Sequence, residues 1–462
     1  MPSNDEVVDV AIVGGGVAGL SAARSLALGG LDNWVVLEGS ERLGGRARSQ
    51  RWSGSTINTG AYYVSGKRNG NPFYEAIKRY GLRTRDIDYN SWTTYGRGEE
   101  RWEDMEKGSD CLDETAHRMW EEFDATGRYQ VATARRVLQE CGWDMTSSMD
   151  RAIEWNYYDW EYGRTPDDLS VYASPAYSYH DFGSVQPLIS DEGGIAKFLI
   201  GLLNDFVPPP HSADTRFRLN SPVNTILTHS TRCPTEAGPN CVELRLNGGK
   251  TIFAKHAILT ASFGVLQRTH QTLLPQGFPG RDVLHKFTMG YFEKVYFRFR
   301  QRFWDDTDFI LDSNAGKPVL MWHPNPHQQQ SQEGVLQVTI TGKDAKNFVG
   351  MDDTQKKMYM LSRLHEMYPG KFTLDDVVDT YFTNWVESPI SYGAWFEHGP
   401  DSSPADYLRL IQPVGNLIIG GEMTCKRYYG YVHGAMVSGE RDANRILAKL
   451  GRPAYDDRRC DS

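Results

Sequence analysis

The stretch VVDVAIVGGGVAGLSAARSLALGGLDNWVVLE, residues 7–38, reads as an apolar strand, a glycine turn, a helix and a second apolar strand that ends on an acid. Gly14, Gly16 and Gly19 have the spacing that allows a tight turn, a close approach of the backbone to a pyrophosphate and close packing of helix on strand. The helix that follows directs its free N–H groups and positive dipole end at the phosphates. Glu38 lies where a carboxylate accepts hydrogen bonds from ribose hydroxyls. The stretch therefore predicts that the chain binds a dinucleotide.

The residues after Glu38 indicate which dinucleotide. The extension GSERLGGR, residues 39–46, resembles the glycine doublet of flavoproteins with two dinucleotide-binding domains, which NAD enzymes lack. Gly44 and Gly45 let the chain pass close to the phosphates, and Arg46 can donate charge-assisted hydrogen bonds to them. We therefore expect FAD.

Composition limits the class of protein. A chain of 462 residues suits two domains, and its net charge of −9 argues against a nucleic-acid partner. Its apolar runs are far shorter than the roughly 20 residues that span a bilayer, so we expect no membrane contact. The N-terminal residues lack the pattern of a secretory signal, which favours a cytoplasmic location, although secretion after removal of a signal stays open.

The six cysteines have no metal-ligand spacing, and we expect no metal site. Their pattern also favours an intracellular protein. Cys233 and Cys241 are different, because they flank a proline- and glycine-containing loop between two strand-like runs. Whether these two form a disulfide is left open by the sequence.

The nucleotide-binding pattern recurs along the chain, which predicts two interleaved, discontinuous domains. We expect an FAD-binding domain made of residues 1–71, 191–270 and 400–455, and a substrate-binding domain made of residues 72–190 and 271–399. In the last FAD-binding segment an apolar strand ends at Gly421 and Glu422, and a helix begins near YYGYVHGA. The positive end of that helix would stabilise negative charge on a reduced flavin ring.

Segments in order along nearly the whole chain resemble the flavin-containing amine oxidase family, and within it the plant and fungal polyamine oxidases. The most specific are VVDVAIVGGGVAGLSAA, VVLEGSERLGGRARS and GGEMTCKRYYGYVHGAMVSGERDANRIL; AILTASFGVLQ and EKVYFRFRQRFW also match. The resemblance implies an α/β fold of the p-hydroxybenzoate-hydroxylase type, with a Rossmann-like FAD domain interleaved with an α+β substrate domain. It also implies hydride transfer from the carbon next to an amine nitrogen to flavin N5, and reduction of O2 to hydrogen peroxide. The substrate would be a polyamine or a smaller related amine.

The resemblance assigns roles to individual residues. Lys294 matches the lysine that binds a water at flavin N5, Tyr431 matches an aromatic wall of the flavin site, and Glu161 matches an acid that reads the substrate ammonium. The opposite wall is left open among Ile390, Tyr392 and Trp395. The residues expected to hold FAD are Gly14, Gly16, Gly19, Glu38, Gly44, Gly45, Arg46, Val223, Gly421, Glu422, Tyr431 and Val432.

Two departures from the family pattern alter the expectation. Monoamine oxidases bond flavin through the cysteine of a Gly-Cys-Tyr turn, whereas this chain has Ala394 there, so we expect noncovalent FAD. Polyamine oxidases have a second glutamate that binds the substrate ammonium where this chain has Ser65, whereas Glu161 stays aligned with the first of the two family acids. Loss of one of two acids predicts a substrate with one dominant cationic amine rather than a long polycation.

The sequence around Glu161 is rich in aromatic residues, which stabilise alkylammonium groups when they are desolvated. Core packing is the alternative interpretation of the same cluster. The cluster comprises Trp155, Tyr157, Tyr158, Trp160 and Tyr162, and Tyr172, Tyr177, Tyr179 and His180 would extend it.

Three other functions share this fold. An amino-acid oxidase would need an arginine for the substrate carboxylate, and no matching motif is found; a desaturase stays open. A non-enzymatic binding protein of the GDP-dissociation-inhibitor type is disfavoured by Lys294 and Tyr431.

Overall fold

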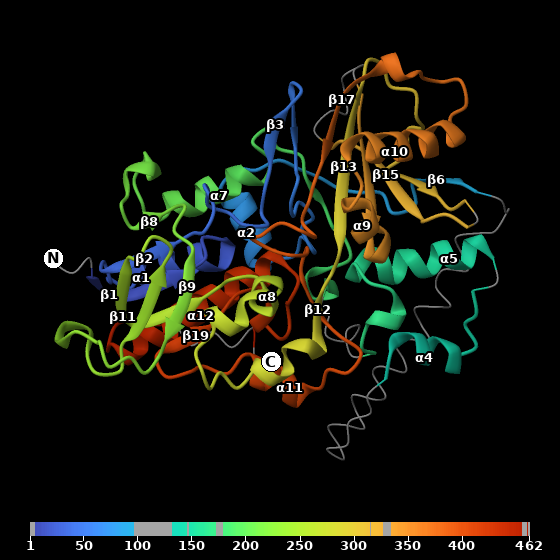
Figure 1. Ribbon diagram of the computed structural model, residues 1–462. Coiled ribbons are helices and arrows are strands. Elements are labelled where there is room, and N and C mark those ends of the chain that lie inside the picture. Colours follow the sequence, from blue (N-terminus) through green and yellow to red (C-terminus); the bar gives the residue numbers. More distant parts are fainter. Residues whose placement is uncertain are drawn as a thin grey trace.

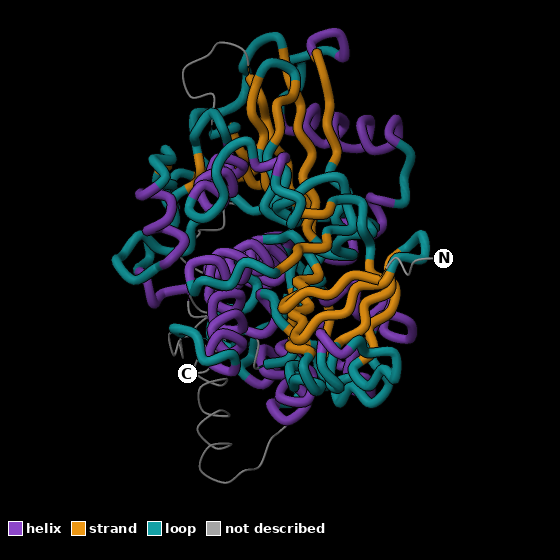
Figure 2. Tube along the Cα trace, turned by 90° about the vertical axis from the view of Figure 1, so that its left-hand side faces the viewer, coloured by secondary structure: helices purple, strands orange, loops and turns teal. Residues whose placement is uncertain are grey.

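Two β-sheets occupy separate halves of the molecule (Figure 1), and the view turned by 90° separates them in the same way (Figure 2). The computed structural model describes residues 5–96, 132–145, 147–171, 179–314, 316–326, 334–454 and 460. Tyr172 and Tyr177 lie outside the described residues, as do the side chains of Tyr179 and His180.

The first sheet has seven strands in the order β8-β2-β1-β11-β10-β9, with β19 also paired to β11. β1 runs parallel to β2 and to β11, and β11 runs parallel to β19, as βαβ connections require, whereas β10 is antiparallel to β11 and to β9. Helices α1 and α12 cover one face through Ile12, Ala22, Leu26, Ala443 and Ile446. The bounds are β1 Asp5–Val13, α1 Val17–Leu28, β2 Trp34–Leu37, β8 Phe217–Arg218, β9 Val223–Leu227, β10 Val242–Leu246, β11 Thr251–Leu259, β19 Leu417–Ile419 and α12 Val432–Lys449.

The second sheet has six strands in the order β17-β13-β16-β15-β14-β6. Alternation along β13 decides what each face contacts: Val295, Phe297 and Phe299 pack against helices α9 and α10, and Phe292 and Lys294 face the other way. The bounds are β6 Trp92–Tyr95, β13 Phe292–Phe299, β14 Phe309–Asp312, β15 Leu320–Pro324, β16 Gly334–Thr341, α9 Gly342–Val349, α10 Asp353–Met367 and β17 Val377–Phe382.

The strands of the first sheet all fall in the segments predicted to bind FAD, and those of the second fall in the segments predicted to bind substrate. Helix α2, Pro72–Arg79, lies at the first predicted boundary and packs on the FAD-binding side. Its Phe73 ring meets Phe198 of α7, Gly194–Asn204, with centroids 4.9 Å apart. The exact domain boundaries stay a prediction.

The connection between the sheets includes a π-helix. Helix α5, Ser148–Glu154, starts with a capping box formed by Ser147 and Asp150, and continues without interruption into a π-helix over Trp155–Trp160. Glu161 follows directly. The remaining elements are α4 Ala134–Glu140, α8 Phe263–Leu273, α11 Pro404–Leu410, β3 Gln50–Trp52, β4 Ser55–Ile57, β5 Thr84–Arg85, β7 Leu188–Ile189, β12 Phe287–Met289 and β18 Phe396–His398.

Disulfides are present in several parts of the chain. Cys233 and Cys241 are bridged, which answers the question that the sequence left open. Cys425, close to the start of α12, is bridged to Cys460, and Cys141 is disulfide-bonded as well. Of the helices in the described ranges, none combines the length and the apolar character needed to cross a bilayer.

Candidate active site

A cavity of about 710 Å³ is lined by residues from both halves of the molecule. It brings together most of the residues that the sequence singles out, although they come from widely separated segments. Gly19 and Val223 are not among its lining residues. Those that line it are Gly14, Gly16, Glu38, Gly44, Gly45, Arg46, Glu161, Lys294, Gly421, Glu422, Tyr431 and Val432.

The glycines of the first turn serve different purposes. A Cβ at Gly19 would lie 2.0 Å from the carbonyl oxygen of Gly14, so this glycine is required by the contact of helix and strand. A Cβ at Gly16 would meet no protein atom within 4 Å and would project into open space. The backbone is therefore exposed to the cavity at Gly16, at the start of α1, where a pyrophosphate would be held by N–H groups. This geometry fits a dinucleotide.

Glu38 directly follows β2 and lines the cavity. Its carboxylate accepts hydrogen bonds from the backbone N–H of Gly15 at 2.7 Å and of Ser40 at 2.8 Å, which fix its orientation. Nearby in sequence, Arg42 has a buried Nη2 atom with no hydrogen-bond partner in the described part of the chain. A buried guanidinium nitrogen without a partner is costly, and an anionic ligand would satisfy it. Val223, by contrast, is the first residue of β9 and pairs with Leu246.

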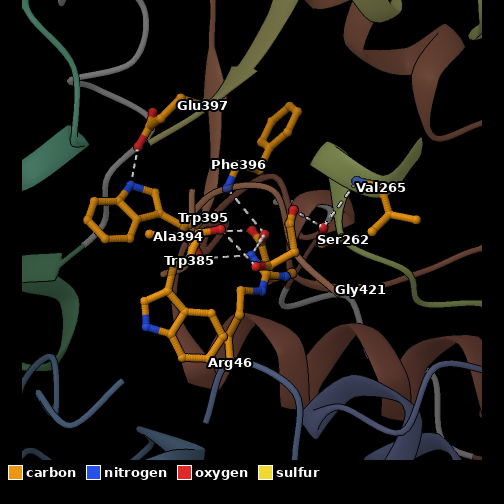
Figure 3. A network of polar contacts seen from close by, with 12 residues as sticks. Arg46, Ser262, Val265, Trp385, Ala394, Trp395, Phe396, Glu397 and Gly421 are labelled. Atoms are coloured by element: carbon orange, nitrogen blue, oxygen red, sulfur yellow. Dashed lines mark hydrogen bonds and ion pairs between the residues drawn. The ribbon is translucent and has the colours of Figure 1, made fainter. Parts of the chain in front are cut away.

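Arg46 and Glu422, which both line the cavity, form an ion pair, and Figure 3 shows Arg46 close to Ala394. Nη1 of Arg46 lies 2.8 Å from Oε1 of Glu422 and 3.0 Å from the carbonyl oxygen of Ala394. Glu422 also accepts the N–H groups of Phe396 and Gly430, at 3.2 and 2.8 Å. Glu422 is thus occupied by protein donors, and it ties the strand end of the FAD-binding half to the segment that carries Ala394.

Helix α12 begins at the same place. Tyr431 is its N-cap and Val432 its first residue, and both line the cavity. The free N–H groups of the first turn therefore lie beside the cavity, where they favour negative charge.

Lys294 is buried, with 5% of its surface exposed. It lies beside three successive carbonyl groups, those of residues 58–60, which we call the carbonyl row. Its Nζ donates to the carbonyl oxygens of Asn58 at 3.0 Å and Gly60 at 2.6 Å. Burial holds the pKa of Lys294 well below its ordinary value, and the neighbouring Glu293 opposes this in part. The same row accepts the hydroxyl of Tyr296 at Asn58 (2.7 Å) and the indole N–H of Trp385 at residue 59 (2.8 Å).

Glu293 was not singled out by the sequence analysis. It lies on the opposite face of β13 from Lys294 and accepts the backbone N–H of Val386 at 2.7 Å and the hydroxyl of Thr383. Burial raises the pKa of Glu293 to about 7, against the lowering effect of these hydrogen bonds. It fixes the start of the segment that leads to Ala394 and Trp395. The sequence does contain a signal for Glu293, because it is an acid on the otherwise apolar face of an alternating strand.

Glu161 faces the cavity next to Tyr431, whose hydroxyl donates to its Oε1 at 3.1 Å. Burial raises the pKa of Glu161, and the hydrogen bond from Tyr431 lowers it. Ser65, which occupies the place of the second family acid, is buried and also lines the cavity. The described acids that line the cavity are Glu38, Glu161 and Glu422.

A wall of aromatic rings leads away from Trp395. The centroid of Trp395 is 5.4 Å from that of Phe292, which is 5.3 Å from that of Trp160. Trp395 and Ile390 both line the cavity, whereas Tyr392 lies apart from it under the guanidinium of Arg268. Of the aromatic cluster around Glu161, Tyr157, Tyr158, Trp160 and Tyr162 line the cavity, and Trp155 packs into the core.

No thiol is available for a covalent bond to a cofactor in the described part of the chain, because its cysteines are all in disulfides. In the same part, no group of three or more His, Cys, Asp or Glu side chains could hold a metal ion.

Comparison with known proteins identifies the family. The family described as flavin containing amine oxidoreductase matches residues 17–447. Polyamine oxidase 1 of Zea mays is 24% identical over 461 residues, covering 95% of this chain and 90% of the relative. Polyamine oxidase 6 of Oryza sativa subsp. japonica is 26% identical, with coverage of 95% and 90%.

Solved structures share the fold. A putrescine oxidase with bound putrescine superposes with a TM-score of 0.74 at 18% identity, over 96% of this chain and 100% of the other. A cyclohexylamine oxidase from Brevibacterium oxydans IH-35A gives a TM-score of 0.76 at 17% identity, with the same coverage. The predicted fold class and the family resemblance are confirmed. The chain therefore belongs to the flavin containing amine oxidoreductase family, and it is an amine oxidase whose FAD is held without a covalent bond.

Proposed function

We propose that this enzyme oxidises an amine with one dominant cationic group, and that Glu161 binds that group. Bound FAD would supply the oxidising chemistry by accepting a hydride from the carbon next to the amine nitrogen and passing the electrons to O2. The amine loses two electrons and two protons in total, so the products are an imine and hydrogen peroxide.

The observation that carries the proposal is the state of the three acids in the cavity. Glu38 accepts two backbone N–H groups, and Glu422 is paired with Arg46 and accepts two more. Within the described ranges, Glu161 accepts one hydrogen bond, from Tyr431, and keeps acceptor capacity toward the cavity. A desolvated ammonium is costly unless it is paired, so one open carboxylate supports one ammonium.

Relatives supply a contrast. The related plant enzymes are named polyamine oxidases, and the structurally similar putrescine oxidase binds a diamine. Ser65 cannot supply the charge of a second carboxylate, so a second ammonium in this cavity would lack a partner. This difference supports a smaller or less highly charged substrate.

The chain's own residues divide the remaining tasks in this proposal. The Gly16 turn and Arg46 bind the cofactor, and the first turn of α12 stabilises negative charge beside Tyr431. Lys294 lines the cavity, and the carbonyl row fixes the position of its Nζ, which is a proton donor there. The aromatic wall excludes water, which strengthens the ion pair of substrate and Glu161.

Peroxide release across a panel of monoamines, diamines and polyamines tests the proposal. We expect Glu161→Gln to lower kcat/KM for the best amine by about 30-fold or more, because a desolvated charge pair is worth roughly 2–5 kcal/mol. Ser65→Ala is the matched control and should change it less than about three-fold. The proposal is wrong if spermine or spermidine is the best substrate, or if the Glu161→Gln enzyme is undiminished. Absence of peroxide with every amine would refute amine oxidation itself.

An amino-acid oxidase is disfavoured by the charges in the cavity. Arg46 is the single arginine among its described lining residues, and it is paired with Glu422. A substrate carboxylate would therefore have no free guanidinium to bind.

We also infer that the protein matures in an oxidising compartment. Three described regions of the chain carry disulfide-bonded cysteines, and such bonds persist mainly outside the reducing cytosol. This inference differs from the expectation of a cytoplasmic location, which rested on cysteine spacing and on the N-terminal residues. Thiol counting on the purified native protein, before and after reduction, would test it.

A further inference from the structure

The cavity has an outer chamber, which we define by Tyr63, Tyr89, Trp92, Trp160 and Phe309. Trp92 stacks on Phe309 at 4.3 Å, Tyr89 lies 5.6 Å from Phe309, and Tyr63 meets Trp160 edge-on at 6.5 Å. The buried ring of His323 joins these two groups, with its centroid 5.2 Å from that of Trp160 and 5.1 Å from that of Phe309. Tyr89 is 41% exposed, whereas Lys294 is 5% exposed. The chamber therefore lies on the side of the cavity that opens to solvent.

The polar groups of the outer chamber are neutral. The hydroxyl oxygen of Tyr63 is buried and makes no hydrogen bond of normal geometry within the described residues. Burial holds the pKa of Tyr63 well above its ordinary value, and the phenols of Tyr62 and Tyr89 raise it further, so all three hydroxyls lie near one another. The Tyr62 hydroxyl already accepts the amide of Gln337 at 3.2 Å.

Among the described residues, a second ammonium would find no further carboxylate beside this chamber. Burial raises the pKa of Tyr89, and the charge of Glu161 raises it more than that of Asp308 does, so Glu161, which accepts the Tyr431 hydroxyl, is the acid that acts on the chamber. Asp308 is paired with Arg85 and accepts the N–H of Asp88 at 2.8 Å. What the chamber offers is a set of aromatic faces and a buried phenol hydroxyl in need of a partner.

We propose that the outer chamber binds the neutral aromatic body of the substrate, and that the Tyr63 hydroxyl bonds a polar atom on that ring. The substrate class is then an arylalkylamine whose ring carries a hydroxyl or a ring N–H. Its ammonium lies on Glu161, and its ring packs against the cavity-facing sides of Trp160 and Phe309. This inference rests on the proposed function, because it assigns a binding site to the part of the amine that is not oxidised.

The physical basis is the cost of a buried polar group without a partner. A ring that carries a hydrogen-bonding group satisfies the Tyr63 hydroxyl. An unsubstituted ring of the same length leaves that hydroxyl without a hydrogen bond. A site built to bond a substrate hydroxyl discriminates strongly against the analogue that lacks it. Offset and edge-to-face ring contacts add stabilisation that a flexible diamine does not gain.

Steady-state kinetics with three amines of similar reach test the inference: 4-hydroxyphenethylamine, phenethylamine and 1,5-diaminopentane. In the unaltered enzyme we expect kcat/KM for the phenolic amine to exceed that for phenethylamine by about ten-fold or more. The diamine should be the poorest of the three.

Tyr63→Phe removes the hydroxyl and keeps the ring. It should abolish the preference for the phenolic amine and leave phenethylamine within about two-fold. Tyr95→Phe is the matched control, because Tyr95 is on β6 with Trp92 but its hydroxyl bonds Asp305 at 2.9 Å, outside the cavity. It should leave the preference unchanged.

Inhibition gives a second measurement that does not depend on turnover of an aromatic amine. With pentylamine as substrate, 4-ethylphenol should inhibit competitively, and about ten-fold more weakly in Tyr63→Phe. Equal efficiencies for phenol and phenyl amines, an undiminished preference in Tyr63→Phe, or a diamine as best substrate would each overturn the inference while leaving amine oxidation intact. Failure of all three amines and of pentylamine would instead count against the proposed function.

Discussion

Lys294 illustrates how one residue serves both chemistry and architecture. Its ammonium lines the cavity and at the same time bonds two carbonyls of the carbonyl row. We expect Lys294→Met to keep FAD, since the phosphate-binding turn is untouched, and to slow reduction or reoxidation of the flavin by about ten-fold or more. Stopped-flow absorbance measures both half-reactions.

Tyr296→Phe is the control for the architectural part, because its hydroxyl bonds the same Asn58 carbonyl without lining the cavity. It should leave both rates within about two-fold and cost roughly 1–3 kcal/mol of stability, the typical price of an unmade buried bond. Rates in Lys294→Met that match those of the unaltered enzyme would rule out its chemical role.

The Glu161–Tyr431 pair predicts a specific pH dependence. Burial raises the pKa of Glu161 above the ordinary 4.5, and binding of an ammonium requires the ionised form, so kcat/KM should fall as pH drops through this raised pKa. The Tyr431 hydroxyl stabilises the carboxylate and lowers that pKa. In Tyr431→Phe the acidic limb of the pH profile should therefore move to higher pH, and in Glu161→Gln it should vanish. A limb that moves to lower pH in Tyr431→Phe would contradict the assignment.

At the scale of elements, the π-helix over Trp155–Trp160 determines where Glu161 lies. A π-helix carries one more residue per hydrogen-bonded turn than an α-helix. Because the π turn already accommodates its one extra residue, insertion of a further alanine after Asn156 should turn the following residues by about 100°, which moves Glu161 away from the cavity. We expect the insertion to lower kcat/KM as much as Glu161→Gln, with FAD retained by absorbance. If Glu161→Gln lowers the activity of the insertion variant by as much again, Glu161 has not moved.

Elements with a strong sequence period were predictable. The apolar runs on either side of the Gly-x-Gly-x-x-Gly turn predicted β1, α1 and β2, and the apolar run that ends at Gly421 predicted β19. The π-helix was not predictable, because its residues are compatible with an ordinary helix and only tertiary packing selects the wider turn. For the same reason the position of Tyr392 could not be separated from those of Ile390 and Trp395.

At the scale of the molecule, the disulfides differ in what they constrain. The Cys425–Cys460 bridge closes a separation of 35 residues and the Cys233–Cys241 bridge one of 8. In the chain-entropy account the longer loop gives the larger stabilisation, so Cys425→Ser with Cys460→Ser should cost roughly 2–4 kcal/mol and the other double variant less. Thermal unfolding followed by flavin fluorescence compares the two. A larger loss for the Cys233 and Cys241 pair would show that loop length is not the deciding factor.

The bridge to Cys460 was beyond prediction, since six cysteines allow many pairings and only the topology brings residue 460 to the start of α12. The interleaving of the two halves was more accessible. Three occurrences of the nucleotide-binding pattern were visible in the residues, and each of them supplies strands to the first sheet. Side-chain partners across the halves, such as Arg46 with Ala394, were invisible because 348 residues separate them.

The carbonyl row has a consequence for dissecting the protein. Its three carbonyl groups belong to residues 58–60, yet their donors are Lys294, Tyr296 and Trp385, which come from the other half of the chain. Expressed alone, the nucleotide-binding half would have three carbonyl groups that lack these donors. The other half would have a Lys294 Nζ that lacks these acceptors. Neither half is then an autonomous folding unit, and co-expressed fragments should regain FAD only by complementing each other.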